Sequence, residues 1–128
     1  MRARILFAFL VIICGVVLSA PLAAHHSSSG YDMEHPVTKK GVVTNMEWTN
    51  PHVFIYMDMK DANGNVEEWR VEGNSPNMLF RAGWKKEMIK PGDTMEITAA
   101  QAKNGTKVYR LISVTLANGQ KFDGQGFK

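Results

Sequence analysis

The stretch from His52 to Gly83 decides the fold, and it reads HVFIYMDMKDANGNVEEWRVEGNSPNMLFRAG. Side chains alternate along its first nine residues, which is the period of a half-buried strand. One face of this strand carries Val53, Ile55, Met57 and Met59. Asn63-Gly64 then favours the positive φ of a tight hairpin turn, and residues 66–73 alternate again. The stretch therefore predicts two antiparallel strands joined by a short turn.

A short helix is expected directly after this hairpin. Ser75 is a preferred N-cap, and Pro76 is well tolerated at the first helical position. Gly83 is suited to end the helix, because glycine adopts the left-handed conformation without steric cost. The residues expected to pack inward are Met78, Leu79 and Ala82.

Three further strands are expected, one before the hairpin and two after the helix. Residues 39–48, KKGVVTNMEW, predict the first of them, and Asn50-Pro51 ends it in a turn. Residues 94–103, TMEITAAQAK, predict the next one, and residues 106–119 the last. In this last strand the inward residues are expected to be Val108, Ile112, Val114 and Leu116.

The order of these elements predicts a mainly β fold, a small five-stranded OB-like barrel with one short helix between strands 3 and 4. Closure into a barrel removes the exposed strand edges that favour aggregation. We assign residues 37–128 to this single domain, in which residues 121–123 can add a short final strand. A small β-sandwich is the alternative architecture.

Residues 1–24 have the three-part layout of a signal peptide. Arg2 and Arg4 form the positive head, Ile5–Leu18 is apolar, and SAPLAA supplies small residues before a cut expected after Ala24. The apolar run has 14 residues, fewer than the roughly 20 that a membrane-spanning helix needs. We therefore expect a periplasmic protein with no stable membrane span after cleavage. An uncleaved anchor is the alternative.

Cleavage would change both the cysteine count and the charge. Cys14 lies within the leader, so the processed chain would hold no disulfide, no thiolate nucleophile and no cysteine metal site. The net charge of +3 would fall to +1, because Arg2 and Arg4 leave without any acidic residue. No basic stripe is visible, so we expect no nucleic-acid partner. Residues 25–36, HHSSSGYDMEHP, are polar and aperiodic and are expected to form a flexible arm.

Five short motifs are shared with a known family. They are AHHS (24–27), EWTNPH (47–52), SPNMLFRAGW (75–84), KPGD (90–93) and ANGQKF (117–122). On these motifs the chain resembles the family of small exported bacterial proteins known as the domain of unknown function 6152. The resemblance spans nearly the whole processed chain. It implies export and a small β-rich fold, and it carries no activity, substrate or site.

The histidines form one candidate site, for copper or zinc. If the leader is cut after Ala24, His25 offers both its ring nitrogen and a free α-amino group, whose pKa lies near 7.7–8. One more imidazole, from His26, His35 or His52, would complete a nitrogen set that copper(II) accepts. The alternative is that adjacent histidines in a polar arm bind nothing.

The turn motif EWTNPH gives the second candidate site. Trp48, Asn50 and His52 stand at a strand–turn–strand junction, where OB-type folds bind ligands at the rim. In the structural alternative Asn50-Pro51 only makes the turn and Trp48 packs into the core. A further alternative is a stacking surface for a sugar or another flat ligand, built if Trp48, Tyr56, Trp69 and Tyr109 all face outward.

Catalytic motifs are absent from the sequence. It contains no G-x-S-x-G, no glycine-rich phosphate loop and no H-E-x-x-H. The carboxylates alternate along the strands, which is typical of a solvated face. We therefore expect a non-catalytic exported binding protein for a small ligand that the sequence does not name. The alternatives are a periplasmic copper or zinc binder and a structural or interaction subunit of an envelope complex.

Overall fold

The computed structural model describes residues 28–124 of the chain. The expected leader, its cleavage site, His25 and His26 lie outside these residues. The strands are β1 (Val37–Glu47), β2 (Phe54–Lys60), β3 (Val66–Glu72), β4 (Thr94–Gln101), β5 (Val108–Thr115) and β6 (Lys121–Asp123). The helical elements are η1 (Ser28–Gly30), α2 (Pro76–Arg81) and η2 (Lys86–Met88).

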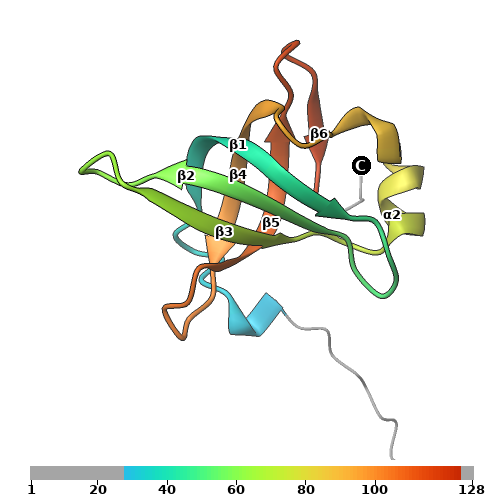
Figure 1. The fold of residues 1–128 in the computed structure, drawn as a ribbon. Coiled ribbons are helices and arrows are strands. Elements are labelled where there is room, and N and C mark those ends of the chain that lie inside the picture. Colours follow the sequence, from blue (N-terminus) through green and yellow to red (C-terminus); the bar gives the residue numbers. More distant parts are fainter. Residues whose placement is uncertain (1–27, 125–128) are drawn as a thin grey trace, which may run out of the picture.

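Strands β1 to β5 close into a barrel (Figure 1). Neighbouring strands follow the order β3-β2-β1-β4-β5-β6, and every pair in this list is antiparallel. A parallel pairing of β3 with β5, which joins Val71 to Tyr109, closes the ring. The predicted OB-like barrel is therefore confirmed, with its helix between strands 3 and 4, and the sandwich alternative is wrong.

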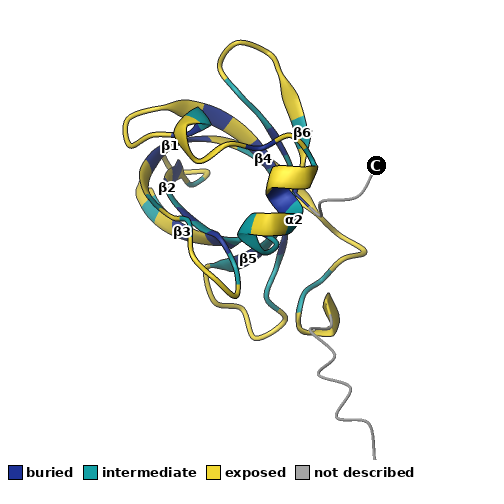
Figure 2. Cartoon of the chain, turned by 90° about the vertical axis from the view of Figure 1, so that its right-hand side faces the viewer, coloured by how far each residue is buried: buried dark blue, intermediate teal, exposed yellow. Residues whose placement is uncertain are grey.

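Helix α2 lies at one end of the barrel (Figure 2). The Oγ of Ser75 accepts a hydrogen bond from the Met78 amide at 3.3 Å, and Pro76 occupies the first turn, as predicted. The C-cap is Ala82, and Gly83 follows it with a φ of 94°. Leu79 is fully buried, so this short helix is held by its contact with the barrel core.

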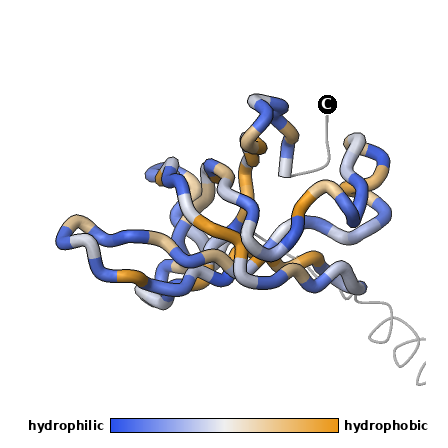
Figure 3. Tube along the Cα trace, turned by 45° about the horizontal axis from the view of Figure 1, so that its top comes forward, coloured by the Kyte–Doolittle hydropathy of each residue, from blue (hydrophilic) through white to orange (hydrophobic). Residues whose placement is uncertain are grey.

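The core fills the inside of the barrel through strand alternation, which Figure 3 shows as alternating hydropathy along the strands. The inward residues predicted for β2 are all buried, and so is Trp84. The rings of Trp69 and Tyr109 stack inside at 3.7 Å between centroids. An outward stacking surface that includes these two rings is therefore ruled out, because both lie inward at the β3–β5 closure.

The inward face of β5 differs from the predicted one. Tyr109, Leu111 and Val114 are buried, whereas Val108, Ile112 and Leu116 are only partly buried. The cause is a register shift opposite β4: Thr98 pairs with Ser113, and the next residue, Ala99, pairs with Leu111. The intervening Ile112 has no partner on β4, so the bulge moves the inward positions by one residue.

The end of the expected arm is attached to the barrel. Tyr31 forms an isolated bridge with Ala102, and the Asp32 amide donates to the Gln101 carbonyl at 2.8 Å. The Lys103 amide donates to the Gly30 carbonyl at 2.9 Å. Hydrogen bonding to the barrel thus begins before β1. No helix among the described residues is long and apolar enough to cross a membrane.

Candidate functional site

Four polar side chains from distant parts of the sequence meet on the outside of the barrel. Tyr31 comes from the N-terminal segment, His52 from the loop before β2, Glu72 from the end of β3, and Arg110 from β5. Glu72 pairs with Phe54 of β2 and with Arg110 of β5. These register positions alternate with buried Val71 and Tyr109, so their side chains point away from the core. We call these four residues the Glu72 cluster.

Glu72 is the centre of this cluster. Its Oε1 lies 2.5 Å from the Nδ1 of His52, and its Oε2 accepts a hydrogen bond from the Tyr31 hydroxyl at 2.5 Å. The Nη1 of Arg110 lies 4.0 Å from Glu72 Oε1 and donates to the Gly73 carbonyl at 2.9 Å. The side chains of His52 and Arg110 are 15% exposed and that of Glu72 is 17% exposed. These polar groups are therefore largely shielded from solvent, although they lie outside the core.

The pKa of Tyr31 is raised within this cluster. Burial raises the pKa of Tyr31 to about 12, and the hydrogen bond and negative charge of Glu72 act in the same direction. The positive charges of Arg110 and Arg70 lower this pKa and are outweighed. The hydroxyl is therefore a hydrogen-bond donor throughout the neutral range, and it ties the N-terminal segment to β3.

Flat side chains lie beside the cluster on the same outer face. The guanidinium of Arg70 sits 4.0 Å from the centroid of the Phe54 ring. Tyr56 pairs with Arg70 across the strands, and its hydroxyl donates to Glu47 Oε1 at 3.2 Å. Phe54 and Tyr56 are half-buried and Arg70 is exposed. The face thus combines stacking groups with a cation.

The predicted rim residues take three different positions. Trp48 is half-buried and packs against the core, and Asn50 is exposed in the turn, where the Asn50–Pro51 peptide is cis. Of these three, the structure brings only His52 into the Glu72 cluster. A pocket formed jointly by Trp48, Asn50 and His52 stays a prediction.

The described histidines have separate partners. The Nδ1 of His35 lies 3.1 Å from each carboxylate oxygen of Asp32 on the exposed surface, whereas His52 contacts Glu72. Within residues 28–124, no group of three or more histidine, aspartate or glutamate side chains is arranged to hold a metal ion. The metal site predicted from His25, His26, His35 and His52 stays a prediction, because its first two members lie outside the described residues.

Sequence reasoning did not single out Tyr31, Glu72 or Arg110. Alternation along β3 predicts that Glu72 points outward, which is equally expected of a solvated carboxylate. Only the parallel pairing of β3 with β5 brings Arg110 next to it. Only the order in which the strands pair could therefore have indicated this cluster.

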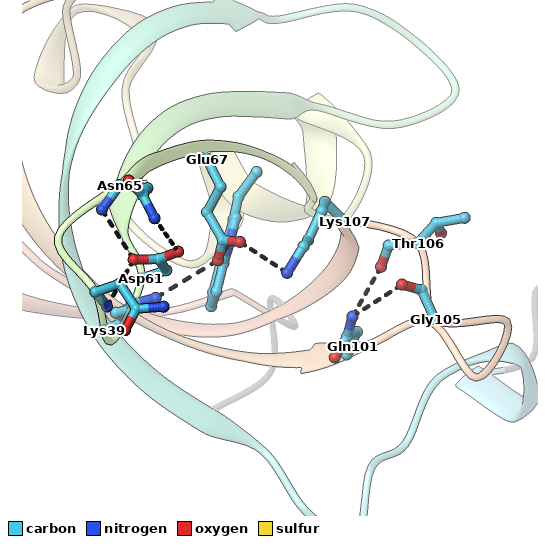
Figure 4. Close-up of polar contacts among 10 residues, drawn as sticks. Lys39, Asp61, Asn65, Glu67, Gln101, Gly105, Thr106 and Lys107 are labelled. Carbon is cyan, nitrogen blue, oxygen red and sulfur yellow. Dashed lines mark hydrogen bonds and ion pairs between the residues drawn. The ribbon is translucent and has the colours of Figure 1, made fainter.

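A second polar group lies near the start of β3 (Figure 4). Glu67 Oε2 lies 2.8 Å from the Nζ of Lys107, and its Oε1 lies 3.5 Å from the Nζ of Lys39. The Nε1 of Trp69 also donates to Glu67 Oε1, at 2.8 Å. The hydrogen bond with Lys107 is the main reason why the pKa of Glu67 is lowered. The Glu67 carboxylate thus has contacts with Lys39, Lys107 and the Trp69 indole at the same time. We therefore assign this group a structural role beside the Trp69 ring.

Comparison with known proteins supplies the family. A model described as a family of unknown function, DUF6152, matches residues 13–110. The chain belongs to this family. The matched range contains all four residues of the Glu72 cluster, so the cluster lies within the DUF6152 domain. Neither a search of curated proteins nor a search of solved structures finds a match.

Proposed function

We propose that this DUF6152 protein is an exported, non-catalytic binding protein whose ligand docks against the Glu72 cluster. The observation that carries the proposal is the shielding of His52, Glu72 and Arg110, which are at most 17% exposed although they lie outside the barrel core. Ligand sites typically present a small number of precisely placed polar groups beside apolar and aromatic ones.

The position of the cluster supports the same proposal. OB-type barrels bind ligands on the face of their second and third strands, together with the loop between the first two. His52 lies in that loop, and Glu72 ends β3. The adjacent Phe54, Tyr56 and Arg70 offer stacking and cationic contacts to a ligand.

Export and the absence of catalysis belong to the proposal as well. Export is supported by the positive head, the apolar run and the small residues of positions 1–24. A non-catalytic role is supported by the engagement of Glu72, whose two oxygens contact His52 and Tyr31. A carboxylate held in this way positions its neighbours and is poorly placed to take up a substrate proton.

Metal binding is the second candidate, and the attachment of Tyr31 favours it. Tyr31 and His52 contact the two oxygens of the same carboxylate. Cleavage after Ala24 would leave His25 six residues before Tyr31, within about 22 Å of chain. A histidine whose Nδ1 contacts a carboxylate also has the outer-shell arrangement of metal-binding histidines. A copper or zinc ion shared by His25 and His52 is therefore the second candidate function. A role as a subunit of an envelope complex is the third.

Native mass spectrometry of the protein isolated from its own cells tests the proposal. We expect the polypeptide mass of residues 25–128 together with an additional mass from an organic ligand. The additional mass should disappear in His52→Ala and persist in Lys60→Ala, whose side chain is exposed on β2 away from the cluster. Circular dichroism shows whether each variant is folded.

Each outcome has a distinct meaning. An adduct with the mass of one copper or zinc ion, lost in His52→Ala, replaces the main proposal with the metal alternative. A co-purified polypeptide assigns the protein to an envelope complex. An adduct that persists in folded His52→Ala, or a bare wild-type chain, overturns binding at the Glu72 cluster. A polypeptide that begins at Met1 overturns processing.

A further inference from the structure

We propose that the α2 end of the barrel docks on an anionic phospholipid surface through Phe80 and the basic residues that follow it. The docking end comprises residues 76–90, which include α2 and η2. The proposal concerns a surface separate from the Glu72 cluster and does not depend on the ligand proposed there.

Phe80 is the most exposed large apolar residue among those described. Its side chain is 65% exposed, whereas its neighbour Leu79 is fully buried against the core. The helix is therefore held by one side and presents an aromatic ring to solvent on another. An exposed aromatic ring flanked by basic side chains is a feature of segments that lie in a membrane interface.

Basic side chains surround this ring in the sequence. Arg81, Lys85, Lys86 and Lys90 are all exposed, and Glu87 is the acidic residue among them, so residues 76–90 carry a net charge of +3. Within residues 28–124, none of these four cations forms an ion pair with a carboxylate. Their charge is therefore available to an external anion.

The opposite end of the molecule carries balanced charge. The β2–β3 hairpin projects away from the side of the barrel that carries α2 (Figure 1). Residues 58–68 of this hairpin contain four acidic residues against Lys60. Glu67 is paired with lysines, but Asp58 and Glu68 are exposed and face each other across the strands. With Lys39, Lys40 and Lys107 beside it, this end has no net charge, so the excess of positive charge lies at the α2 end.

The combination of one aromatic ring with flexible cations favours a lipid surface. The negative electrostatic potential of an anionic leaflet attracts nearby lysines, and an aromatic ring can enter the interface beside them. A fluid surface makes no demand for a fixed geometry of the four cations, and none is held here by a partner among the described residues. The occupant is therefore a membrane rich in anionic phospholipid.

Vesicle flotation tests this proposal on the protein as isolated from its own cells. Phosphatidylcholine vesicles with phosphatidylglycerol should bind the protein, and this binding should weaken as salt is added. Phe80→Ser should lower the partition coefficient about tenfold. The double variant Lys85→Glu/Lys86→Glu should abolish binding.

Matched controls lie at the other end of the barrel. Val66→Ser removes an apolar side chain that is 62% exposed on the hairpin. The double variant Lys40→Glu/Lys60→Glu changes the net charge by the same amount as the test variant. Both controls should bind vesicles like the wild type.

The proposal is overturned if the wild type does not bind anionic vesicles, or if it binds pure phosphatidylcholine equally well. Equal losses in Phe80→Ser and Val66→Ser would also overturn it, because the α2 end would then have no special part. A protein that co-purifies in a Phe80-dependent manner, without any vesicle binding, would assign this surface to an acidic protein partner instead.

Discussion

Glu72 shows how one residue connects three parts of the chain. Its two carboxylate oxygens contact the His52 ring and the Tyr31 hydroxyl, and the Arg110 guanidinium lies 4.0 Å away. Loss of its charge would leave the shielded Arg110 guanidinium and the His52 ring with a weaker partner, which is costly in a site of low solvent access. It would also weaken the side-chain contact from Tyr31, which adds to the backbone hydrogen bonds that hold the N-terminal segment on the barrel.

At the residue scale, Glu72→Gln should lower the pKa of Tyr31 from about 12. The value should remain above the ordinary 10.0, because burial is the larger cause of the shift and persists in the variant. Carbon-13 NMR of labelled tyrosine during a pH titration measures this change. Glu47→Gln, which removes the negative charge beside the Tyr56 hydroxyl, should leave Tyr31 unchanged. An unaltered Tyr31 pKa in Glu72→Gln would contradict the role given to this contact.

At the scale of single elements, β3 carries a different function on each face. Its inward residues Trp69 and Val71 belong to the core, while its outward Arg70 and Glu72 belong to the candidate site. Glu67 is partly buried, and its carboxylate accepts a hydrogen bond from the Trp69 indole. The same carboxylate pairs with Lys39 and Lys107. The carboxylate thus lies at the edge of the indole, with the Nζ of Lys39 5.1 Å from the ring centroid, and it joins β1, β3 and the loop before β5.

The Glu67 contacts should make stability depend on pH at the acidic end. The folded state lowers the pKa of Glu67 below its ordinary 4.5, chiefly through Lys107. The stabilisation is therefore fully present above pH 4.5 and is lost as pH falls through the lower folded value. Glu67→Gln should cost about 1 kcal/mol at neutral pH, and its difference from the wild type should shrink under acid.

Urea unfolding at a series of pH values measures this dependence. Glu68→Gln is the matched control, since Glu68 is exposed on the opposite face of the same strand. A Glu67→Gln deficit that stays constant from neutral to strongly acidic pH would show that the carboxylate charge does not matter.

At the scale of the whole molecule, stability depends on closing the barrel. The parallel β3–β5 pairing involves few residues, Arg70 to Glu72 with Val108 to Arg110, and it joins segments that are far apart in the sequence. The stacked rings of Trp69 and Tyr109 lie just inside this closure. The same pairing brings Arg110 to Glu72, so the closure that completes the core also assembles the candidate site.

Tyr109→Ala should therefore destabilise the protein by about 3–5 kcal/mol, as expected for deleting a buried aromatic ring. Tyr109 is 2% exposed, whereas Tyr56 lies on the outer face and is only half-buried. Tyr56→Ala is the control and should cost about 1 kcal/mol or less. Denaturant midpoints compare the two variants, and Tyr109→Phe, which keeps the ring, should stay close to the wild type. Equal costs for Tyr109→Ala and Tyr56→Ala would contradict the importance of the closure.

The sequence by itself determined the order and type of the elements. The patterns that indicated them extend over only a few residues, so each can be recognised from the local sequence. They are the alternation along residues 52–60, the Asn63-Gly64 turn and the Ser75-Pro76 helix start. Together they were enough to predict the OB-like barrel, whereas the family was identified by resemblance on five short motifs. The inward face of β5 was predicted incorrectly, because the bulge at Ile112 depends on its pairing with β4.

Tertiary structure alone decided which polar residues meet. Tyr31, His52, Glu72 and Arg110 are separated by twenty or more positions along the chain, and no local pattern links them. Their contacts arise because strand pairing sets the register of Glu72 against Arg110, and because the N-terminal segment bonds back onto the barrel at Ala102. Local periodicity specifies which face a side chain occupies, whereas the partners on that face depend on long-range closure.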